Sequence, residues 1–392
     1  MHSAPLGRTI PLTALAAAAM VFSGCQDSPS PISTDLSPED AMAAANAATQ
    51  GESFLRLYNR NVFLGGDTGP LFEIDFSQFP ANILEVVGAV QTFWGEVQSS
   101  DFPARAEAIA DDIAATRPHV VGLNEMSSYA LVDLASGPFA SLDFTSILLD
   151  ALAARGLDYR LEIKQDNTAA QLPFALGAAG VTQIVSLTVS DLVLVRGDVD
   201  LVSKANANYQ ASLDLGVFEV KRGWGRVSVL HQGSTHNVFV THLETQGLLP
   251  IHNFQADELL ALSTSLEGPT YVMGDLNSDA ENGPPAPSWT PTYGKFLDAG
   301  FVDGWLEKTG RDRDGFTCCW DPDLAAGSLD ERIDFMLVRA PGAGNGATTL
   351  PGAVQMDLLG DEESDRLPGA GIFPADHVGV FGAFNLPGGL TR

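Results

Sequence analysis

The feature of this sequence that most restricts its fold is a set of short apolar runs, each ending abruptly in a residue that can bind a cation or carry a proton. Three of these runs, with the polar residues that end them, are Val120–Leu123 before Asn124 and Glu125, Val238–Thr241 before His242, and Tyr271–Gly274 before Asp275. Runs of β-branched and apolar residues of this length predict buried strands. Ladder hydrogen bonds fix a strand end, so side chains there have little positional freedom, which suits a chemical site. The pattern therefore predicts a site built on strand ends.

The rest of the chain predicts strands and helices mixed within one folded region. Residues 104–116, 144–155, 254–266 and 293–299 have apolar positions at helical spacing, and strand-like runs lie between them. With 45% hydrophobic and 18% charged residues, the body of the chain can bury a core. No internal repeat or Pro/Ser-rich linker divides residues 51–388, so we expect a single α+β domain there. The irregular order of strands and helices does not specify how the layers are arranged.

The N-terminal segment is typical of an export signal. Arg8 precedes an apolar stretch that is too short to span a bilayer, and the segment ends at Cys25. This ending resembles a bacterial lipoprotein box, which implies that residues 1–24 are removed and that Cys25 receives a lipid anchor. An ordinary secretory signal with a chance cysteine is the alternative. Residues 25–50 have the composition of a disordered tether, so we expect an exported protein that is lipid-anchored to the bacterial cell envelope, or otherwise secreted.

The charge and the cysteine count restrict partners and cross-links. With 21 basic and 49 acidic residues, the formal net charge is −28. Such a chain is unsuited to sequence-independent binding of nucleic acid backbones, which uses clustered Lys and Arg. Nucleic acid is possible only as a substrate, since a metal site can hold a phosphate on an acidic protein. Three cysteines are too few for a disulfide framework. We expect the adjacent Cys318 and Cys319 to be two small buried or half-buried residues, because a bridge between neighbours departs from the usual disulfide geometry.

Each polar residue at a strand end has a structural alternative when it is considered alone. An Asp after a strand is more often a turn former or a helix cap, so Asp275 alone indicates little. The same holds for Glu125 and Asn61, and His242 alone fits a core histidine as well as a functional one. The order of several such segments along the chain is more informative than any one of them.

Six polar segments follow one another between Tyr58 and His377. They are Tyr58-Asn59-Arg60-Asn61-Val62, Pro118-His119-Val120-Val121-Gly122-Leu123-Asn124-Glu125, Thr241-His242-Leu243, Gly274-Asp275-Leu276-Asn277, Arg332-Ile333-Asp334-Phe335 and Asp376-His377. In this order they resemble the endonuclease/exonuclease/phosphatase superfamily of metal-dependent phosphoesterases, and within it an exported bacterial branch whose substrate the resemblance does not specify. The resemblance implies a four-layer α/β/β/α sandwich with two mainly antiparallel sheets, and a site at one edge where strand ends gather.

The resemblance also implies a metal site with oxygen ligands. Glu125 is the main ligand, and Asn61 and Asp376 support it directly or through water. A hard divalent cation prefers such ligands, so we expect Mg²⁺, with Mn²⁺ or Ca²⁺ as alternatives. The sequence lacks the clustered His and Cys spacing of a zinc site.

Five further residues receive catalytic roles from the resemblance. His377 is the candidate general base, and Asp334 accepts a hydrogen bond from its ring. Asp275 orients the attacking water or helps to deprotonate it, and Asn277 donates a hydrogen bond to the phosphoryl group. His242, if charged, binds a non-bridging oxygen. The sequence leaves open whether His377 or Asp275 is the effective base.

Two arginines are candidates for substrate binding. Arg196 and Arg222 carry guanidinium groups, which suit a second phosphate or a carboxylate. A surface ion pair or core packing is the alternative for each of them.

The expected function is that of an exported, metal-dependent phosphoesterase that hydrolyses phosphate mono- or diesters by metal-assisted in-line attack of water. A nuclease that cleaves DNA or RNA is the first alternative. A catalytically inactive binding module on the same scaffold is the alternative from another class. We expect a monomer.

Overall fold

The computed structural model describes residues 53–308 and 314–386. The expected signal peptide (1–24), the expected tether (25–50) and Cys25 lie outside the described residues. Within the described part of the chain, no helix is both long enough and apolar enough to cross a membrane.

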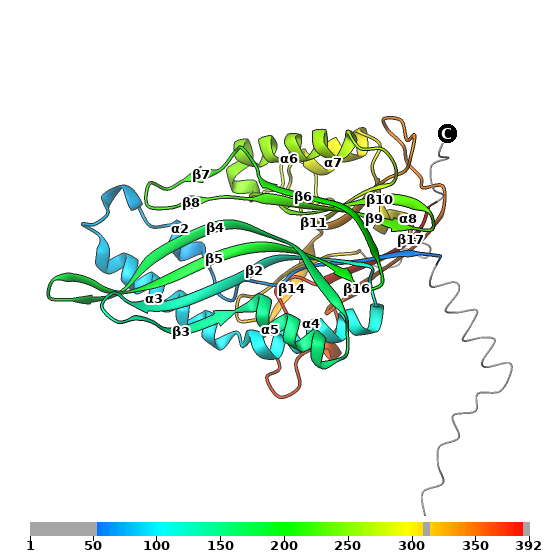
Figure 1. Cartoon of the computed structure of the whole chain (residues 1–392). Helices are drawn as coiled ribbons and strands as arrows, with labels where there is room; N and C mark the ends of the chain where they lie inside the picture. Colours follow the sequence, from blue (N-terminus) through cyan, green and yellow to red (C-terminus); the bar gives the residue numbers. More distant parts are fainter. Residues whose placement is uncertain (1–52, 309–313, 387–392) are drawn as a thin grey trace, which may run out of the picture. The chain divides into compact units, whose positions relative to one another are not determined.

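The described residues form two large β-sheets (Figure 1). The first has the strand order β16-β17-β1-β2-β5-β4, with β3 paired to β2. Its strands are β1 (Leu55–Asn61), β2 (Val120–Asp133), β3 (Gly137–Asp143), β4 (Tyr159–Gly177), β5 (Gly180–Arg196), β16 (Ala353–Leu359) and β17 (Gly379–Asn385). The second has the order β12-β15-β11-β10-β9-β6. Its strands are β6 (Asp200–Asn208), β9 (Gly223–His231), β10 (Ser234–His242), β11 (Thr270–Asp275), β12 (Val302–Asp303) and β15 (Asp334–Arg339).

Each sheet is antiparallel except for one pair of strands. In the first sheet β1 and β2 are parallel, and in the second β10 and β11 are parallel. In the second sheet the parallel strands β10 and β11 end together, at His242 and Asp275. In the first sheet β1 ends at Asn61 beside Asn124, but β2 continues to Asp133, so the strand end expected after Leu123 is wrong.

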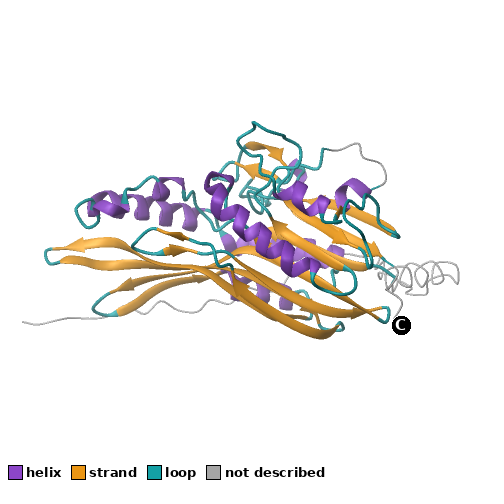
Figure 2. Cartoon of the chain, turned by 90° about the horizontal axis from the view of Figure 1, so that it is seen from above, coloured by secondary structure: helices purple, strands orange, loops and turns teal. Residues whose placement is uncertain are grey.

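The two sheets pack face to face, and helices cover their outer faces (Figures 1 and 2). A core of mainly β-branched and aliphatic side chains lies between the sheets, for example Leu57, Val193, Val240 and Met273. The outer face of the first sheet packs against α3 (Ile83–Ser99), α4 (Phe102–Thr116) and α5 (Phe144–Ala154). The outer face of the second packs against α6 (Leu249–Thr264) and α7 (Thr292–Asp298). The expected four-layer α/β/β/α sandwich is confirmed.

Smaller elements complete the described residues. They are α2 (Gly69–Phe72), η1 (Phe76–Gln78), β7 (Leu213–Asp214), β8 (Glu219–Val220), η2 (Gln246–Leu248), α8 (Gly304–Glu307), β13 (Cys318–Trp320), β14 (Gly327–Glu331) and η3 (Glu363–Asp365). The β13–β14 hairpin lies against the polar edge, because the backbone of Cys318 forms a bridge with that of His377.

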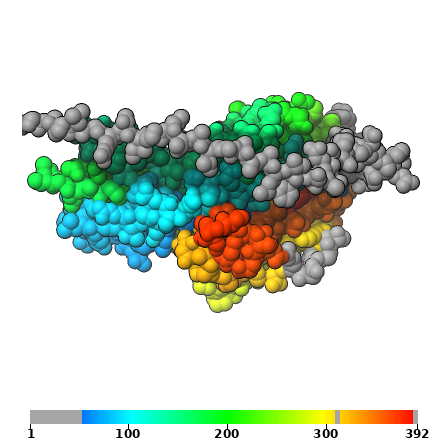
Figure 3. All heavy atoms as spheres, turned by 90° about the horizontal axis from the view of Figure 1, so that it is seen from below, coloured from blue at the N-terminus to red at the C-terminus, as the bar shows by residue number. Residues whose placement is uncertain are grey.

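A buried arginine joins distant parts of the chain beneath this edge. Arg105 of α4 is fully buried, and its guanidinium donates hydrogen bonds to the carbonyl oxygens of Val62, after β1, and Pro374, before β17. The space-filling view accordingly shows the cyan surface around residue 100 next to the orange-red surface of the C-terminal part (Figure 3). The loops on which Asn61 and Asp376 depend are thereby fixed to one helix.

Candidate active site

Three strands of the second sheet carry polar side chains next to one another. His242, at the end of β10, is the register partner of Asp275, at the end of β11, and Asp275 is also the partner of Asp334, at the start of β15. Because β15 runs antiparallel to the other two strands, its start meets their ends. Gly274 has φ 140°, and a Cβ there would overlap the carbonyl oxygen of Thr241. A glycine is therefore required where these strands approach each other.

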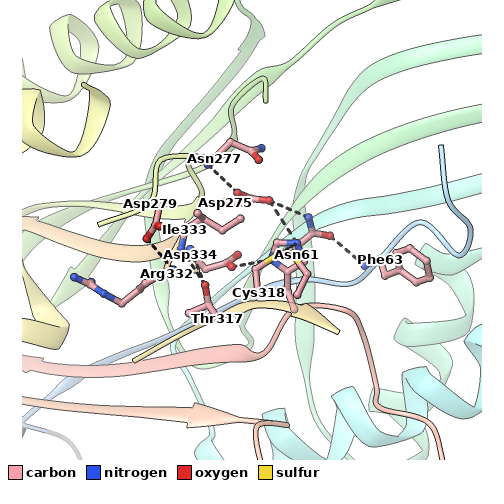
Figure 4. The surroundings of a disulfide bond; sticks show 12 residues. Asn61, Phe63, Asp275, Asn277, Asp279, Thr317, Cys318, Arg332, Ile333 and Asp334 are labelled. Carbon is pink, nitrogen blue, oxygen red and sulfur yellow. Dashed lines mark hydrogen bonds and ion pairs between the residues drawn. A yellow bond between two sulfur atoms is a disulfide. The ribbon is translucent and has the colours of Figure 1, made fainter. Parts of the chain in front are cut away.

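The carboxylate of Asp275 is the point on which the polar side chains converge. Its Oδ2 lies 3.2 Å from Asn61 Nδ2, 3.3 Å from His242 Nε2 and 3.8 Å from His377 Nε2. Its Oδ1 accepts a hydrogen bond of 2.9 Å from the backbone N–H of Asn277 (Figure 4). Burial, and after it the charge of the neighbouring carboxylate on β15, raises the pKa of Asp275 to about 7. A proton can therefore be exchanged at this carboxylate near neutral pH.

His377 is oriented through one nitrogen of its ring. Its Nδ1 lies 2.8 Å from Oδ2 of Asp334, whose side chain is fully buried and whose backbone N–H donates to Thr317 Oγ1. The other ring nitrogen, Nε2, faces Asp275. Burial opposes a charge on this ring, but the nearby carboxylates of Asp334 and Asp376 outweigh it and raise the pKa of His377 well above its ordinary value. This is the geometry of an imidazole that a carboxylate orients to hold or pass a proton at Nε2.

His242 differs from His377 in its charge. Arg222 Nη1 lies 3.0 Å from His242 Nδ1, and since a guanidinium can only donate, Nδ1 is the acceptor. The proton of the neutral ring is then on Nε2, which faces Asp275 Oδ2. Burial, followed by the charge of Arg222, holds the pKa of His242 well below its ordinary value. The conditional expectation of a charged His242 is therefore not met; the structure favours a neutral ring with one N–H to donate.

Arg222 thus lies at the site, as proposed from the sequence, but its terminal nitrogens are engaged by protein groups. Besides the contact with His242, its Nη2 lies 3.4 Å from Glu244 Oε1. In this structure Arg222 therefore positions the ring of His242.

Glu125 reaches the site because β2 has a bulge at this point. Asn124 and Glu125 of β2 lie opposite the single residue Asp191 of β5. Glu125 has φ 61°, in the left-handed region that residues other than glycine seldom adopt, and such strain is concentrated at functional sites. Its Oε2 accepts a hydrogen bond of 2.8 Å from the N–H of Leu64, and its Oε1 lies 3.9 Å from His242 Nδ1. The bulge therefore directs a carboxylate of the first sheet toward a histidine of the second.

A buried acid that the sequence patterns did not single out supports this bulge. Asp191 accepts hydrogen bonds from Asn124 Nδ2 at 3.0 Å and from Asn167 Nδ2 at 2.8 Å, and burial raises its pKa to about 6. Asn124 Nδ2 also lies 3.0 Å from the carbonyl oxygen of Thr241 in the second sheet, so it joins the two sheets beside the site. The available signal was an acid at the start of the apolar run 191–195.

The other two metal candidates adjoin this group. Asn61, at the end of β1, donates to Asp275, and its Oδ1 accepts a backbone N–H. Asp376 directly precedes His377, and its Oδ1 is buried with no hydrogen-bond partner among the described residues. Burial is the main cause that raises the pKa of Asp376 to about 7, and the charge of Glu125 adds to it. A buried, unpartnered carboxylate oxygen beside a second acid is a group that a bound cation would satisfy, so these oxygen donors fit a hard divalent cation.

Arg196 does not lie at the site. It is the last residue of β5, and because β5 is antiparallel to β2, it lies beside the start of β2. Its Nε lies 2.6 Å from Asp198 Oδ1, and its Nη1 donates to the carbonyl oxygen of Arg117. The substrate-binding hypothesis for Arg196 is therefore wrong, and the structural alternative, a surface ion pair, is correct.

A cleft with a volume of about 430 Å³ opens beside His377 and Asn277. Its other lining residues are Thr245, Gln246, Gly247, Pro287, Cys318, Cys319, Glu331 and Ile333. None of these described lining residues is Lys or Arg, and Glu331 is the only acid among them. Apart from the imidazole of His377, the described lining of the cleft therefore offers no positive charge.

One wall of this cleft contains a disulfide bond between Cys318 and Cys319 (Figure 4). This differs from the expectation of two unlinked residues. Cys318 is buried and Cys319 is exposed. Cys318 Sγ lies 3.6 Å from His377 Nε2. The sequence could not indicate this proximity, because the two residues are brought together by long-range pairing of the β13 backbone.

Two stacked sheets, an acid–histidine group at the strand ends and oxygen donors suited to a cation define the class of metal-dependent hydrolases of phosphate esters. The sequence profile of the Endonuclease/Exonuclease/phosphatase family matches residues 90–377. The chain belongs to this family, so it is a hydrolase that acts on phosphate ester bonds and depends on a divalent metal. The resemblance inferred from the six segments is confirmed.

Solved structures agree with the fold. The chain is similar to an endonuclease/exonuclease/phosphatase from Beutenbergia cavernae, with a TM-score of 0.50 and 20% identity, over 85% of this chain and 72% of that one. It is also similar to a family protein from Leptotrichia buccalis, with a TM-score of 0.50 and 13% identity, over 84% of this chain and 99% of that one. Among curated proteins, no sequence matches significantly. At these identities, the likeness concerns the fold alone.

Proposed function

We propose that this protein is an exported, Mg²⁺-dependent phosphoesterase that hydrolyses phosphate esters of small or lipid-linked alcohols by in-line attack of water. The observation that carries the proposal is the convergence of three side chains, Asn61, His242 and His377, on one carboxylate oxygen. A hydrolase of this kind must place the water, neutralise the phosphate and manage a proton within one small volume. The converging groups can place the water and manage its proton, and the bound cation would neutralise the phosphate.

The cation would be held by the side-chain oxygens of Asn61, Glu125 and Asp376. When bound, it supplies positive charge that stabilises the phosphate oxygens as negative charge develops on them. An oxygen-only set of ligands favours Mg²⁺, and Mn²⁺ or Ca²⁺ are the expected substitutes.

The remaining residues bind the substrate and move the proton. His377, held at Nδ1 by Asp334, exchanges a proton at Nε2, and the carboxylate of Asp275, 3.8 Å from that nitrogen, orients the attacking water or shares the proton. The neutral His242 has one N–H, at Nε2, which faces Asp275 Oδ2 in this structure and would turn to a phosphate oxygen when substrate binds. One N–H of Asn277 is used by the carbonyl oxygen of Leu243, which leaves the second for the phosphoryl group.

The cleft favours an alcohol without further phosphates over a nucleic acid strand. A polyanionic strand is normally held by Lys and Arg along its backbone. The described lining of this cleft has neither, and Glu331 would repel a second phosphate. The net charge of −28 acts in the same direction. A nuclease activity is the second candidate.

The test measures hydrolysis of bis-p-nitrophenyl phosphate, p-nitrophenyl phosphate, sphingomyelin, plasmid DNA and RNA by the purified protein. We expect turnover of a small or lipid ester that stops in excess EDTA and returns with Mg²⁺ or Mn²⁺. Activity that persists in excess chelator would contradict the metal dependence, and a clear preference for DNA or RNA would establish the nuclease alternative.

The proposed export rests on residues 1–25 and is tested separately. In a bacterial host, we expect the chain to incorporate labelled palmitate and to fractionate with membranes. The Cys25→Ala variant should lose the label. An unlabelled but secreted chain would instead indicate an ordinary signal peptide.

A further inference from the structure

We propose that the Cys318–Cys319 disulfide is a positioning element of the hydrolytic site, and that its reduction by a dithiol lowers turnover reversibly. The inference rests on the proposed role of His377. It concerns residues to which neither the family nor the proposed mechanism gives a function.

The first observation is the contact between the disulfide and the reactive side of the imidazole. Cys318 Sγ lies 3.6 Å from His377 Nε2, whereas Nδ1 is occupied by Asp334. The sulfur is therefore next to the nitrogen that also faces Asp275 and the cleft. A disulfide sulfur has no hydrogen, so it can donate nothing to Nε2 and leaves that nitrogen available to the reaction. A thiol at the same place has an S–H that can be donated to Nε2 of the neutral ring, which is the form that accepts a proton from water.

The second observation is that the segment containing the disulfide braces both members of the His377–Asp334 pair. Cys318 forms a backbone bridge with His377, and the N–H of Trp320 donates to the carbonyl oxygen of Asp376. On the other side, Thr317 Oγ1 accepts the backbone N–H of Asp334. A change in the conformation of residues 317–320 therefore reaches the imidazole and its carboxylate together.

The third observation is access. Cys318 is buried, but Cys319 is exposed and both line the cleft. A thiolate of a dithiol reductant can attack Cys319 Sγ, which breaks the S–S bond and forms a mixed disulfide, while Cys318 leaves as a thiolate and takes up a proton. The second thiol of the reductant then attacks the mixed disulfide and releases Cys319. In total, two electrons and two protons pass to the cysteines, and the dithiol becomes a cyclic disulfide.

The reduced site differs from the oxidised one in two ways. The thiol of Cys318 competes with water for His377 Nε2, and residues 317–320 lose the link that restricts their backbone. Because a displacement of about 1 Å can reduce turnover about 100-fold, we expect kcat to fall at least about tenfold on reduction. KM should change much less, because the sulfur adjoins the proton-transfer group.

The experiment measures kcat and KM on bis-p-nitrophenyl phosphate before reduction, after dithiothreitol treatment and removal, and after reoxidation with diamide. Thiol titration confirms each state. The Cys318→Ala/Cys319→Ala variant is the matched control and should show no response to either reagent, which separates disulfide chemistry from chelation of the metal. An unchanged kcat in protein shown to be fully reduced would overturn the proposal.

A readout that does not require activity separates this proposal from the proposed function. In protein labelled with ¹⁵N-histidine, the ring resonances of His377, assigned with His377→Asn, should shift on reduction, while those of the distant His119 should not. A shift in a protein that hydrolyses no phosphate ester would refute the proposed function and retain the positioning contact. Unshifted His377 resonances would overturn the positioning role even in an active enzyme.

Discussion

Replacing Asp275 by Asn should remove activity and, at the same time, remove the free-energy cost of ionising a buried carboxyl group. The side chain is almost fully buried, and its pKa is raised from the ordinary 3.8 to about 7. The folded protein therefore holds a proton that the unfolded chain has already lost between pH 4 and pH 7. A difference of about three pKa units corresponds to about 4 kcal/mol at roughly 1.4 kcal/mol per unit.

The sign of this effect follows from the direction of the pKa change. A raised carboxyl pKa contributes stability below the unfolded value, and that stability is lost as the pH rises through the folded value. Asn cannot ionise, so Asp275→Asn lacks this loss. The difference in the free energy of unfolding, variant minus wild type, should therefore increase by about 4 kcal/mol as the pH rises from 4 to 8.

The assay combines denaturant unfolding in EDTA, at pH 4 to 8, with turnover in Mg²⁺. We expect kcat to fall at least about 100-fold, because the amide cannot accept a proton and would place N–H groups against Asn61 or Asn277. Asp330→Asn, at an exposed position outside the cleft lining, is the matched control. The reasoning is refuted if the two variants have the same pH dependence of stability, or if Asp275→Asn retains near-normal turnover.

Three further predictions test other parts of the site and the fold. Asp334→Asn should lower kcat about 100-fold or more with little change in KM, since the charged partner of the imidazole is lost. A loss of activity that is fully explained by a smaller fraction of folded protein would contradict this role. Glu331→Lys should raise hydrolysis of an oligonucleotide relative to bis-p-nitrophenyl phosphate, whereas Asp330→Lys should not, and an unchanged ratio would exclude Glu331 from specificity. Burial, and after it nearby positive charge, lowers the pKa of His119 to about 3, so the folded state keeps the ring neutral and loses stability as the pH falls below 6.5. In unfolding experiments, His119→Gln should remove about 2 kcal/mol of the loss between pH 8 and pH 5, and an unaltered pH profile would refute this account.

Local sequence patterns predicted the buried strands and the helices α4, α5, α6 and α7, but they missed α3. The expected helices at 104–116 and 144–155 correspond to α4 (Phe102–Thr116) and α5 (Phe144–Ala154), because their apolar positions recur at helical spacing and face one core. The long hairpin of β4 and β5, with 19 and 17 residues, was largely missed. The middle of β4 alternates buried and exposed positions, but the buried positions include the polar Gln165 and Asn167, and the register shifts between Asp166 and Ala169. The sequence of β4 therefore lacks the apolar alternation that predicts a strand.

The site was predicted where a residue lies at a strand end and missed where tertiary pairing places it. His242 and Asp275 end strands whose apolar runs are visible in the sequence. The disulfide and Asp191 reach the site through a hairpin and an antiparallel neighbour, and neither register follows from local pattern. The position of Arg196 was also not predictable from local pattern. It depends on the direction of β5, which runs antiparallel to β2 and places Arg196 beside the start of β2, away from the site.

The two parallel strand pairs explain why so few residues suffice to build this site. In an antiparallel pair, the end of one strand adjoins the start of the next, so polar ends would alternate between the two edges of the sheet. Here β1 ends beside Asn124 of β2 and β10 and β11 end together, so register pairs Asn61 with Asn124 and His242 with Asp275. Hydrogen bonds from Asn61 to Asp275 and from Asn124 to the carbonyl oxygen of Thr241 then join the edges of the two sheets. A substitution that shifted either parallel pair by one residue would turn its polar end toward the opposite face, so the site depends on strand register as directly as it depends on its carboxylates.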